Sequence, residues 1–342
     1  MKITTVGIDL AKNVFQVHGI DAEGRSVLRK KLRRSELLRY FAGLEPCVVG
    51  MEACSGAHHW ARELGALGHT VRLMPAQYVK PYVKTNKNDM ADAAGICEAV
   101  TRPTMRFVPV KSTDQQAVLM LHRARDLLIR QRTMIVNALR GHCAEFGIVA
   151  AQGVWNIGKL VERLAAPDER GIPDLARKVL GVLVEQLAAL ATRIRELEVE
   201  LLAWHRSNVA SRRLETIPGI GPVTASAIVA TVGDGHQFRS GRQFAAWIGL
   251  VPRQNSTGGK PRLGRISKRG DAYLRRLLVH GSRAVVRWRR MSKTTPSPWL
   301  AALLSRRPTN VATVAMANKT ARIVWAVLTR NETYRPASIA VA

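Results

Sequence analysis

The chain has 342 residues, which at roughly 150 residues per domain suggests two or three domains. Hydrophobic residues make up 46% of the sequence, enough for a core in each domain, and this excludes an intrinsically disordered chain. The 53 Lys and Arg residues against 25 Asp and Glu residues give a net charge of +28. Such an excess is typical of proteins that bind a polyanion, so we expect a nucleic acid as the partner, with a membrane surface as the competing possibility.

The sequence gives no sign of a membrane or secretory protein. No apolar run reaches the roughly 18 residues that a spanning helix needs, and the N-terminus lacks the basic and apolar regions of a signal peptide. The four cysteines lack the spacing of zinc ligands, so we expect reduced thiols. We therefore expect a cytoplasmic protein without a membrane partner.

The first 75 residues are predicted to contain β-strands interrupted by two helical segments, and residues 13–20 show the alternation of apolar and polar residues typical of a strand. Strands are expected at residues 3–9, 13–20, 25–32, 47–52 and 70–74, and helices at residues 35–43 and 56–68. Because short turns join the first three strands and a helix joins the last two, we expect an antiparallel meander followed by a β-α-β unit, in an α/β layer fold.

The middle of the chain is predicted to be helical. One long helix is expected at residues 113–145, followed by a stretch rich in Gly and Pro at residues 153–173. Apolar residues then recur at alternating spacings of three and four: Leu180, Leu183, Leu187, Leu190, Ile194, Leu197, Leu201 and Trp204. This pattern is typical of a coiled coil, and we interpret it as the seam of a helix pair or of a dimer. The alternative is an amphipathic helix that packs on its own domain.

Residues 211–342 hold 23 Lys and Arg residues but only four acidic residues, so this part of the chain is predicted to face phosphates. The expected elements are a helix-hairpin-helix at residues 217–233, a helix at 241–248, a Gly-rich basic loop at 252–264, a basic helix at 271–288 with Asp271 as its N-cap, and a helix at 310–329.

Four acids stand out by position. Asp9 and Glu52 end predicted strands, while Asp89 and Asp92 lie three residues apart and share one face if that segment is helical. Acids at strand ends point into the crevice where α/β proteins bind ligands, and like-charged carboxylates need a cation to lie together. We therefore expect these four residues to converge on one or two Mg²⁺ ions, since carboxylate oxygens suit that metal. The alternative is that each acid caps a helix or faces solvent.

Phosphate contacts are expected around two further motifs. In IPGIGPVTA, Gly219 and Gly221 allow positive φ angles, so that backbone amides near a helix N-terminus can bind a phosphate; a plain helix-helix turn is the alternative. The basic loop and the helix after it supply cations that we expect to bind nucleic acid: Arg253, Lys260, Arg262, Arg265, Lys268, Arg269, Arg275 and Arg276.

Ser256 lies among these cations in the Gly-rich loop. A serine in that setting is either a nucleophile toward phosphorus or a residue that only contacts phosphate, and the residues alone favour the second. Thr257 carries the neighbouring hydroxyl, and spacing alone does not indicate which of the two hydroxyls would react. No histidine nearby serves as a base, so a metal held by the four acids is the better candidate for activating a hydroxyl.

Five ordered motifs (GIDLAKNVFQVHGID, MEACSG, NKNDMADA, IPGIGPVTA and STGGKPRLGRISKRGDAYLR) resemble the IS110 family of transposases, in particular its IS1111-like subgroup. The resemblance spans residues 3–330 and implies three domains. The first is an α/β RuvC-like (RNase H-type) domain at residues 1–110, whose closing helix extends to about 148. The second is a helical coiled-coil oligomerisation region at residues 111–210. The third is a mostly α-helical transposase domain at residues 211–330, which contains the helix-hairpin-helix.

The resemblance also implies roles for individual residues. It matches Asp9, Glu52, Asp89 and Asp92 to the DEDD tetrad of the family and Ser256 to its catalytic serine. Where the family usually has Asn after the KRG motif, this chain has Asp271, and both residues cap helices well. The resemblance further implies recombination of donor and target DNA with Mg²⁺ and a structured non-coding bridge RNA, in a dimer or tetramer that brings the serine of one subunit to the acids of another. It also implies a bacterial protein that acts at the nucleoid.

Two other functions are compatible with the residues themselves. One is a metal-dependent nuclease of the Holliday-junction-resolvase kind, in which Ser256 only contacts phosphate. The other is a non-catalytic scaffold that binds DNA or RNA. The nuclease would use the four acids for metal binding but would not use Ser256 as a nucleophile. The scaffold would require neither the acids nor the serine for its function.

Overall fold

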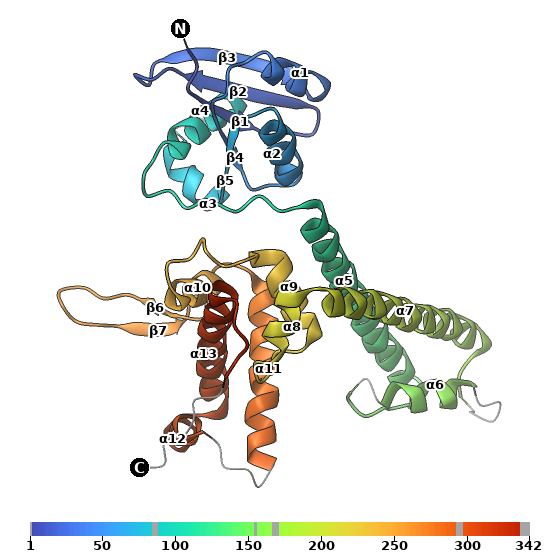
Figure 1. Ribbon diagram of the computed structural model, residues 1–342. Coiled ribbons are helices and arrows are strands. Elements are labelled where there is room, and N and C mark those ends of the chain that lie inside the picture. Colours follow the sequence, from blue (N-terminus) through green and yellow to red (C-terminus); the bar gives the residue numbers. More distant parts are fainter. Residues whose placement is uncertain (1, 84–87, 154–155, 166–170, 292–296, 336–342) are drawn as a thin grey trace. The chain divides into compact units, whose positions relative to one another are not determined.

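The computed structural model describes residues 2–83, 88–153, 156–165, 171–291 and 297–335 (Figure 1). The chain forms two compact units, Met1–Asp114 and Gln115–Ala342. Most of the region predicted to be helical at 111–210 therefore belongs to the same unit as residues 211–330. Asn86 and Lys87 of the NKNDMADA motif, and parts of the stretch 153–173, lie outside the described residues.

The first unit contains a five-stranded mixed sheet in the order β3-β2-β1-β4-β5. The strands are β1 (Thr5–Asp9), β2 (Val14–Ile20), β3 (Ser26–Arg33), β4 (Val48–Glu52) and β5 (Thr70–Met74). β1, β2 and β3 pair antiparallel, whereas β4 pairs parallel to both β1 and β5. The predicted meander and β-α-β unit are confirmed, with each strand within two residues of its expected bounds.

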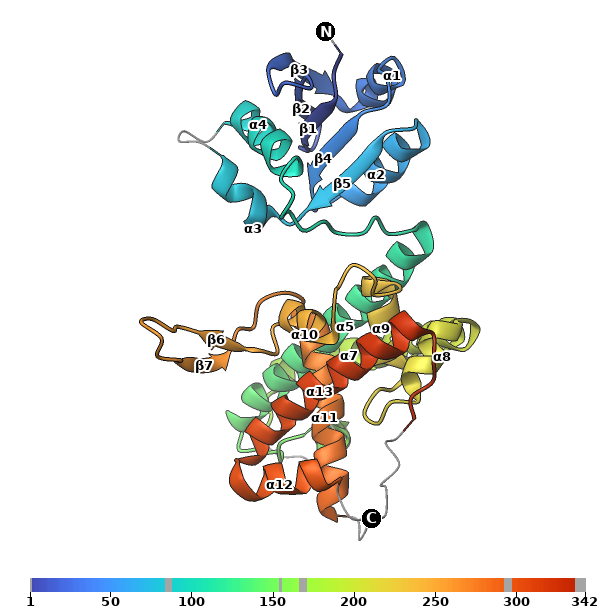
Figure 2. The same ribbon diagram turned by 60° about the vertical axis from the view of Figure 1, so that its left-hand side comes forward.

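Helices cover both faces of this sheet (Figure 2). They are η1 (Arg34–Glu36), α1 (Leu37–Ala42), α2 (Ala57–Ala66), α3 (Ala76–Val79), η2 (Lys80–Tyr82) and α4 (Asp89–Val100). On one face, α1 and α2 bury Phe41, Trp60 and Leu64 against Val6 and Ile8 of β1. The opposite face of β1 is covered by α4, as Figure 2 shows.

Two glycines on adjacent strands allow α4 to lie directly on the sheet. Gly7 and Gly50 are partners in the parallel pairing of β1 with β4. A Cβ atom on Gly7 would fall 2.3 Å from the carbonyl oxygen of Ala93 and 2.4 Å from the backbone nitrogen of Cys97, and one on Gly50 would fall 2.8 Å from Val100 Cβ. Because real side chains essentially never approach so closely, any larger residue at Gly7 would push α4 away from the strand.

The second unit is mainly helical. Its helices are α5 (Thr113–Ala144), α6 (Ile157–Ala165), α7 (Asp174–Ser207), α8 (Val209–Glu215), α9 (Pro222–Val232), α10 (Gly241–Ile248), α11 (Ala272–Met291), α12 (Pro298–Arg306) and α13 (Thr309–Arg330). Two short strands, β6 (Pro252–Gln254) and β7 (Leu263–Ile266), form an antiparallel hairpin between α10 and α11. The largest core cluster joins α8, α9, α10, α11 and α13.

The predicted heptad seam lies on α7 and packs within its own chain. Leu180, Leu187 and Leu190 share a core cluster with Leu139 of α5 and Leu160 of α6. Periodicity predicts the stripe but not its partner, and here intrachain contacts bury much of it. The helix pair α5 and α7 is visible in Figure 1, and it requires no second copy of the chain.

Further contacts fix this pair near the other end of α7. Leu201 packs against Val118 of α5 and Ala230 of α9, and the guanidinium of Arg125 donates hydrogen bonds of 2.9 and 2.5 Å to one carboxylate oxygen of Glu198. The α5–α7 pair is thereby joined to the helix-hairpin-helix of the same unit.

One helix, α13, has the length and apolar composition of a membrane span, which the search for apolar runs in the sequence missed. Ala317, Ala321 and Val324 of this helix are fully buried in the main core cluster. α13 also packs on α10 and α11. Its apolar character is therefore explained by its place in the core of the second unit.

Candidate active site and nucleic-acid interface

Three of the four predicted acids come together in the first unit. Carboxylate oxygens of Asp9, Asp89 and Asp92 all lie within 4.8 Å of one another. Asp9 is the last residue of β1, while Asp89 and Asp92 belong to the first turn of α4. Residues 80 positions apart in the chain thus meet because α4 lies directly on Gly7, two residues before Asp9.

The start of α4 is fixed by its N-cap. The side-chain oxygen of Asn88 accepts a hydrogen bond of 2.8 Å from the backbone N–H of Ala91. The cap defines the first turn, so that Asp89 and Asp92 take positions three residues apart on one face of the helix. Acids in the first turn also interact favourably with the positive end of the helix dipole, which partly offsets their mutual repulsion.

Glu52 lies outside this group of three but on the same side of the sheet. Side chains alternate along a strand, so Asp9 shares a face with Gly7, and Glu52 shares that face with Gly50. Both acids end adjacent parallel strands. Partial desolvation of its sulfur raises the pKa of the Cys54 thiol, and the negative charges of Glu52 and Asp9 raise it further. The Cys54 thiol is therefore close enough to both carboxylates to feel their charges.

The residues fit a divalent cation. Three carboxylates within 4.8 Å repel one another unless a cation neutralises them, and their oxygens are the ligands that Mg²⁺ and Mn²⁺ prefer. Gln16, opposite Asp9 in the register of β1 and β2, adds a buried amide oxygen that has no hydrogen-bond partner among the described residues. The donor set is thus made of oxygen atoms only, as expected for a hard metal ion.

Ser256 belongs to the β6–β7 hairpin, where the sequence predicts a loop. The two strands are exposed and carry little apolar alternation, which explains why the pattern does not indicate a hairpin. The tip is a tight turn, closed by a hydrogen bond of 3.0 Å from the N–H of Lys260 to the carbonyl of Thr257. Gly258 and Gly259 have φ angles of +54° and +73°, the two positive values that a type I′ turn requires.

The hydroxyl of Ser256 is held by the hairpin itself. Its Oγ accepts hydrogen bonds from the backbone N–H of Arg262 at 3.1 Å and from the amide of Gln254 at 3.2 Å. Two donors on one oxygen stabilise the negative charge that builds as a proton leaves. The Thr257 hydroxyl has no hydrogen bond among the described residues, so the surroundings distinguish two side chains that spacing does not.

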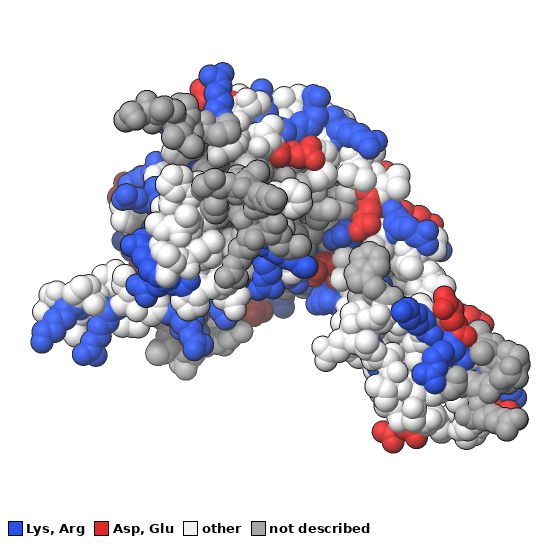
Figure 3. Space-filling model, turned by 90° about the horizontal axis from the view of Figure 1, so that it is seen from below, with Lys and Arg blue, Asp and Glu red and all other residues white. Residues whose placement is uncertain are grey.

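Six of the predicted nucleic-acid contacts have exposed side chains on and beside this hairpin: Arg253, Lys260, Arg262, Arg265, Lys268 and Arg269. Figure 3 shows basic side chains along the projecting arm on its left side, which is the β6–β7 hairpin. The base of the hairpin packs closely on α10, because a Cβ on Gly270 would fall 1.8 Å from the carbonyl oxygen of Trp247. The cations therefore project from an arm whose base contacts the core of the second unit.

The other two predicted cations have partners inside the protein. The guanidinium of Arg275 donates to the carbonyl oxygens of Ile248 at 2.8 Å and Arg269 at 3.0 Å, which fixes the base of the hairpin to α10. Arg276 forms an ion pair with Asp126 of α5. Arg275 therefore has a structural role in this unit, which the sequence pattern does not reveal.

The expectation for the two glycines of the helix-hairpin-helix is half wrong. Gly219 has a φ angle of +86°, but Gly221 is the extended N-cap of α9 with a φ angle of −101°. Gly219 also makes a close approach, since a Cβ on it would fall 2.8 Å from the carbonyl oxygen of Gly281 on α11. Its conformation thus serves helix packing, while the exposed Gly221 is the one of the two at a helix N-terminus open to solvent.

Sequence reasoning misses a buried polar network that joins α5, α9 and α11. His122 Nδ1 lies 3.0 Å from the hydroxyl of Tyr273, and its Nε2 lies 3.1 Å from that of Ser226. Ser226 donates its own proton to the carbonyl of Pro222 at 2.7 Å, so it accepts from His122 Nε2–H, and Nδ1 accepts from Tyr273. Burial lowers the pKa of His122 to about 4, and the charge of Arg125 contributes.

This network places Tyr273 at the first turn of α11, directly after the Asp271 N-cap. The carboxylate of Asp271 accepts a hydrogen bond of 2.9 Å from the backbone N–H of Leu274, as the sequence predicts. No local signal indicates the network, because His122 is 104 residues from Ser226 and 151 residues from Tyr273.

Comparisons with known proteins give matches over nearly the whole chain. Residues 211–295 match the sequence profile of the "Transposase IS116/IS110/IS902 family", and residues 6–147 match a transposase profile of the DEDD type of IS110. The chain is 52% identical to a probable family 20 transposase of Pseudomonas aeruginosa, over 98% of this chain and the whole of that protein. It is 43% identical to the transposase for insertion sequence element IS1111A of Coxiella burnetii, over 97% of this chain and 92% of that protein. The transposase for IS1328 of Yersinia enterocolitica is also 43% identical, over 97% and 98%.

Proposed function

This chain belongs to the IS110 family of transposases, enzymes that cut and join DNA, and on that premise we propose how its residues carry out the reaction. The first unit is a RuvC-like domain whose Asp9, Asp89 and Asp92, with Glu52 beside them, hold Mg²⁺. The convergence of three carboxylates within 4.8 Å carries this proposal. The strand order, with a meander followed by two parallel strands, supports the RuvC-like assignment.

Asp9, Asp89 and Asp92 would hold the ion, and their fixed positions would set where it meets the reacting phosphate. When bound, Mg²⁺ supplies Lewis-acid stabilisation of the phosphate charge and favours ionisation of an attacking hydroxyl. The protein contributes the fixed geometry of Asp9 at the end of β1 and of the capped first turn of α4. Such preorganisation avoids the cost of assembling like charges during the reaction.

Ser256 is the nucleophile. Its Oγ attacks the scissile phosphorus, a P–Oγ bond forms, and the bond from phosphorus to one deoxyribose oxygen breaks. The serine loses its proton to solvent, and the departing oxygen gains one, so that a phosphoserine link and a free DNA hydroxyl result. In the joining step, a hydroxyl of the second DNA attacks the phosphorus of the phosphoserine, the P–Oγ bond breaks, and the serine is restored. Because each step exchanges one phosphodiester for another, strand joining needs no external energy source.

The active form is a homodimer or homotetramer in which Ser256 of one subunit reaches the acids of another. Exposed apolar residues of α7 support an interface, since Leu175, Val179 and Val182 lie on one helix face and are 75, 52 and 62% exposed. These residues are separate from the seam, much of which intrachain contacts bury.

A structured non-coding RNA guides the choice of donor and target DNA, as the family resemblance implies. The exposed cations of the β6–β7 hairpin suit phosphate contacts without base recognition, which is consistent with specificity delegated to base pairing. The reaction takes place in the cytoplasm at the nucleoid. Purification of the intact chain from its host should yield a discrete RNA encoded next to its gene, and absence of such an RNA would contradict the guide.

A trapping experiment tests the nucleophile. A DNA substrate with a nick next to the scissile position should give a covalent protein–DNA adduct with the wild-type chain, detected on a denaturing gel. Ser256→Ala should abolish the adduct and cleavage, whereas Thr257→Val, which removes the neighbouring hydroxyl, should retain both. Full cleavage by the Ser256→Ala variant without an adduct would favour the metal-dependent nuclease.

The carboxylate cluster is tested by metal binding as well as activity. Asp89→Asn should weaken Mn²⁺ binding, followed by calorimetry, at least tenfold and abolish DNA cleavage, while RNA binding persists. Glu98→Gln removes one negative charge from the far end of the same helix, where Glu98 pairs with Arg102, and should preserve both properties. Cleavage that persists in Asp89→Asn at the wild-type rate would favour the non-catalytic scaffold or a metal site elsewhere.

A further inference from the structure

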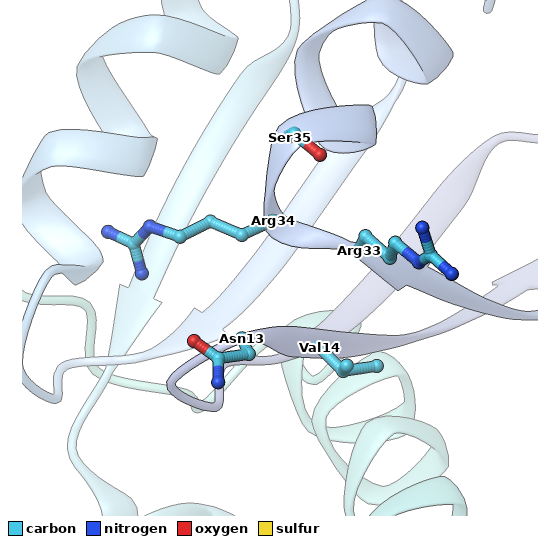
Figure 4. A pocket seen from close by; sticks show the side chains of 5 residues that line it. All are labelled: Asn13, Val14, Arg33, Arg34 and Ser35. Atoms are coloured by element: carbon cyan, nitrogen blue, oxygen red, sulfur yellow. The ribbon is translucent and has the colours of Figure 1, made fainter.

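A shallow cavity of about 510 Å³ lies at the edge of the sheet in the first unit and is lined by Asn13, Val14, Arg33, Arg34 and Ser35 (Figure 4). It occupies the end of the sheet at which Asp9 lies. Val14 pairs with Arg33, and it lies two positions before Gln16, which pairs with Asp9. The turn that follows Asp9 therefore leads directly into the cavity wall.

Arg34 is held in place without being neutralised. Its backbone N–H donates to the carbonyl of Asn13 at 2.8 Å, and its guanidinium donates to the carbonyl of Lys12 at 3.3 Å. The guanidinium also lies over the Trp60 ring at 5.0 Å and the Phe15 ring at 5.8 Å. A guanidinium held over aromatic rings loses little conformational freedom when it binds an anion.

The cavity wall is positively charged. Among the described residues, no carboxylate forms an ion pair with Arg33 or Arg34, and both side chains are exposed. The nearest acid in sequence, Glu36, has one carboxylate oxygen engaged by the backbone N–H of Arg33 at 2.8 Å. Figure 4 shows the two arginines extending in opposite directions from the end of β3, with the Asn13 amide on the side of Arg34. The Arg34 guanidinium, the Asn13 amide and the Ser35 hydroxyl offer donors that a phosphodiester accepts, and Arg33 adds positive charge on the other side of the cavity.

We propose that this cavity binds a backbone phosphate of the DNA strand that is cut at the carboxylate cluster. The proposal rests on the assignment of Asp9, Asp89 and Asp92 to DNA cleavage. The cavity and Asp9 share one end of the sheet, with the Arg34 guanidinium on the face covered by α2 and Asp9 on the face covered by α4. A DNA strand that crosses this end of the sheet from the β3 edge to the carboxylates therefore passes Arg34 and Arg33. A phosphate contact there fixes the position of the strand and contributes no sequence preference. The first unit thereby holds its substrate with its own cations, independently of the basic hairpin.

Site-specific cross-linking of the full chain tests this contact apart from binding by the more basic second unit. A photoreactive residue is introduced as Ser35→p-benzoylphenylalanine, and at the far end of β3 as Ser26→p-benzoylphenylalanine for comparison. Both are prepared with Asp89→Asn so that DNA is not cut, and the probes are a labelled DNA duplex and an RNA duplex of the same sequence. The position 35 variant should cross-link to DNA at least fivefold more than the position 26 variant, and more than it does to RNA.

Charge variants complete the test. Arg33→Gln with Arg34→Gln should reduce cross-linking from position 35 at least fivefold, and Arg33→Gln alone, which leaves the Arg34 guanidinium in place, should reduce it by a smaller factor. Arg106→Gln removes one exposed cation in the segment beyond β5, the opposite edge of the sheet, and should leave the yield unchanged.

Equal cross-linking from positions 35 and 26, preferential cross-linking to RNA, or indifference to both arginine variants would overturn the proposal. Because the readout does not require cleavage, it is separate from the carboxylate assignment. Normal cleavage by Asp89→Asn alone would refute the assigned role of the cluster. Absence of cross-linking from position 35 when both arginines are present would refute the phosphate contact.

Discussion

The two units build their candidate sites in opposite ways. In the first, Asp9 and Asp89 are distant in sequence and meet only because α4 packs on β1. In the second, Ser256 and its donors Gln254 and Arg262 belong to a single hairpin of fifteen residues, 252–266. The first site therefore depends on the packing of a whole sheet, and the second depends on one turn.

Charge follows the same division. Residues 1–114 contain 17 Lys and Arg residues and 11 Asp and Glu residues. Residues 115–342 contain 36 Lys and Arg residues and 14 Asp and Glu residues. The less basic unit is the one that gathers carboxylates, and the strongly basic unit presents the serine.

The largest effect is expected where the first unit is most tightly packed. Gly7→Val places side-chain atoms where Ala93 and Cys97 already lie, so α4 must move and unfolding should become easier by about 3 kcal/mol. Mn²⁺ binding, measured by calorimetry, should be lost with it. Gly65→Ala in α2, which meets nothing within 4 Å, is the matched control and should preserve both properties. Wild-type Mn²⁺ affinity in Gly7→Val would show that the site does not depend on this packing.

A second effect concerns the stability of the helical unit at low pH. The pKa of His122 is about 4 in the folded state, below its ordinary value of about 6.5, so the unfolded chain takes up the proton first as the pH falls. The free energy of unfolding should be constant above pH 6.5, decrease by roughly 3 kcal/mol between pH 6.5 and 4, and level off below. Denaturant titrations that follow Trp fluorescence measure this change.

Removal of the titrating group should flatten that profile. His122→Gln keeps a donor for Ser226 and an acceptor for Tyr273 but does not ionise, so its stability should vary less than that of the wild type between pH 6.5 and 4. An equally steep profile in the variant would assign the pH dependence to other groups, such as His18, whose pKa is lowered by burial and by the charge of Arg29.

The smallest effect on stability, but a clear effect on reactivity, is expected at the hairpin turn. Gly258→Val imposes a side chain at a φ angle of +54°, which should change global stability by less than about 1 kcal/mol because the tip is exposed. The change should reduce the Ser256–DNA adduct several-fold, because the turn aligns Arg262 with Ser256. Gly258→Asn tolerates the same backbone conformation and should retain the adduct. Equal adduct yields from the two variants would contradict a local basis for the serine geometry.

Much of the fold was predictable because it follows local patterns. The alternation of apolar and polar residues indicates β2, and short runs rich in β-forming residues indicate β1 and β4. The Asp271 cap and the bounds of α10 also agree with the structure. The convergence of Asp9 with Asp89 and Asp92 was predictable from strand-end and helix-face positions. Glu52 lies outside that group, because alternation along a strand predicts the face on which a side chain lies but not its distance from other side chains.

What the sequence does not predict depends on contacts between distant segments. The heptad pattern on α7 has the correct period, but its intrachain partners α5 and α6 cannot be identified from periodicity. The β6–β7 hairpin lacks apolar alternation, although the paired glycines of its tip are a turn signal that was available. Arg275 was expected to face phosphate, yet its guanidinium binds backbone carbonyls, because charge counts do not reveal which cations serve the fold.

Cys54 gives the molecule a natural attachment point for a spectroscopic label. Of the four cysteines, Cys47, Cys97 and Cys143 are buried, and Cys54 alone is exposed. Burial raises the pKa of Cys47 to about 11 and of Cys97 to about 12, so these thiols resist alkylation. A nitroxide attached to Cys54 at mildly alkaline pH requires no engineered mutation. Pulsed electron resonance between two such labels then measures the separation of two carboxylate clusters in an assembled oligomer, with and without DNA.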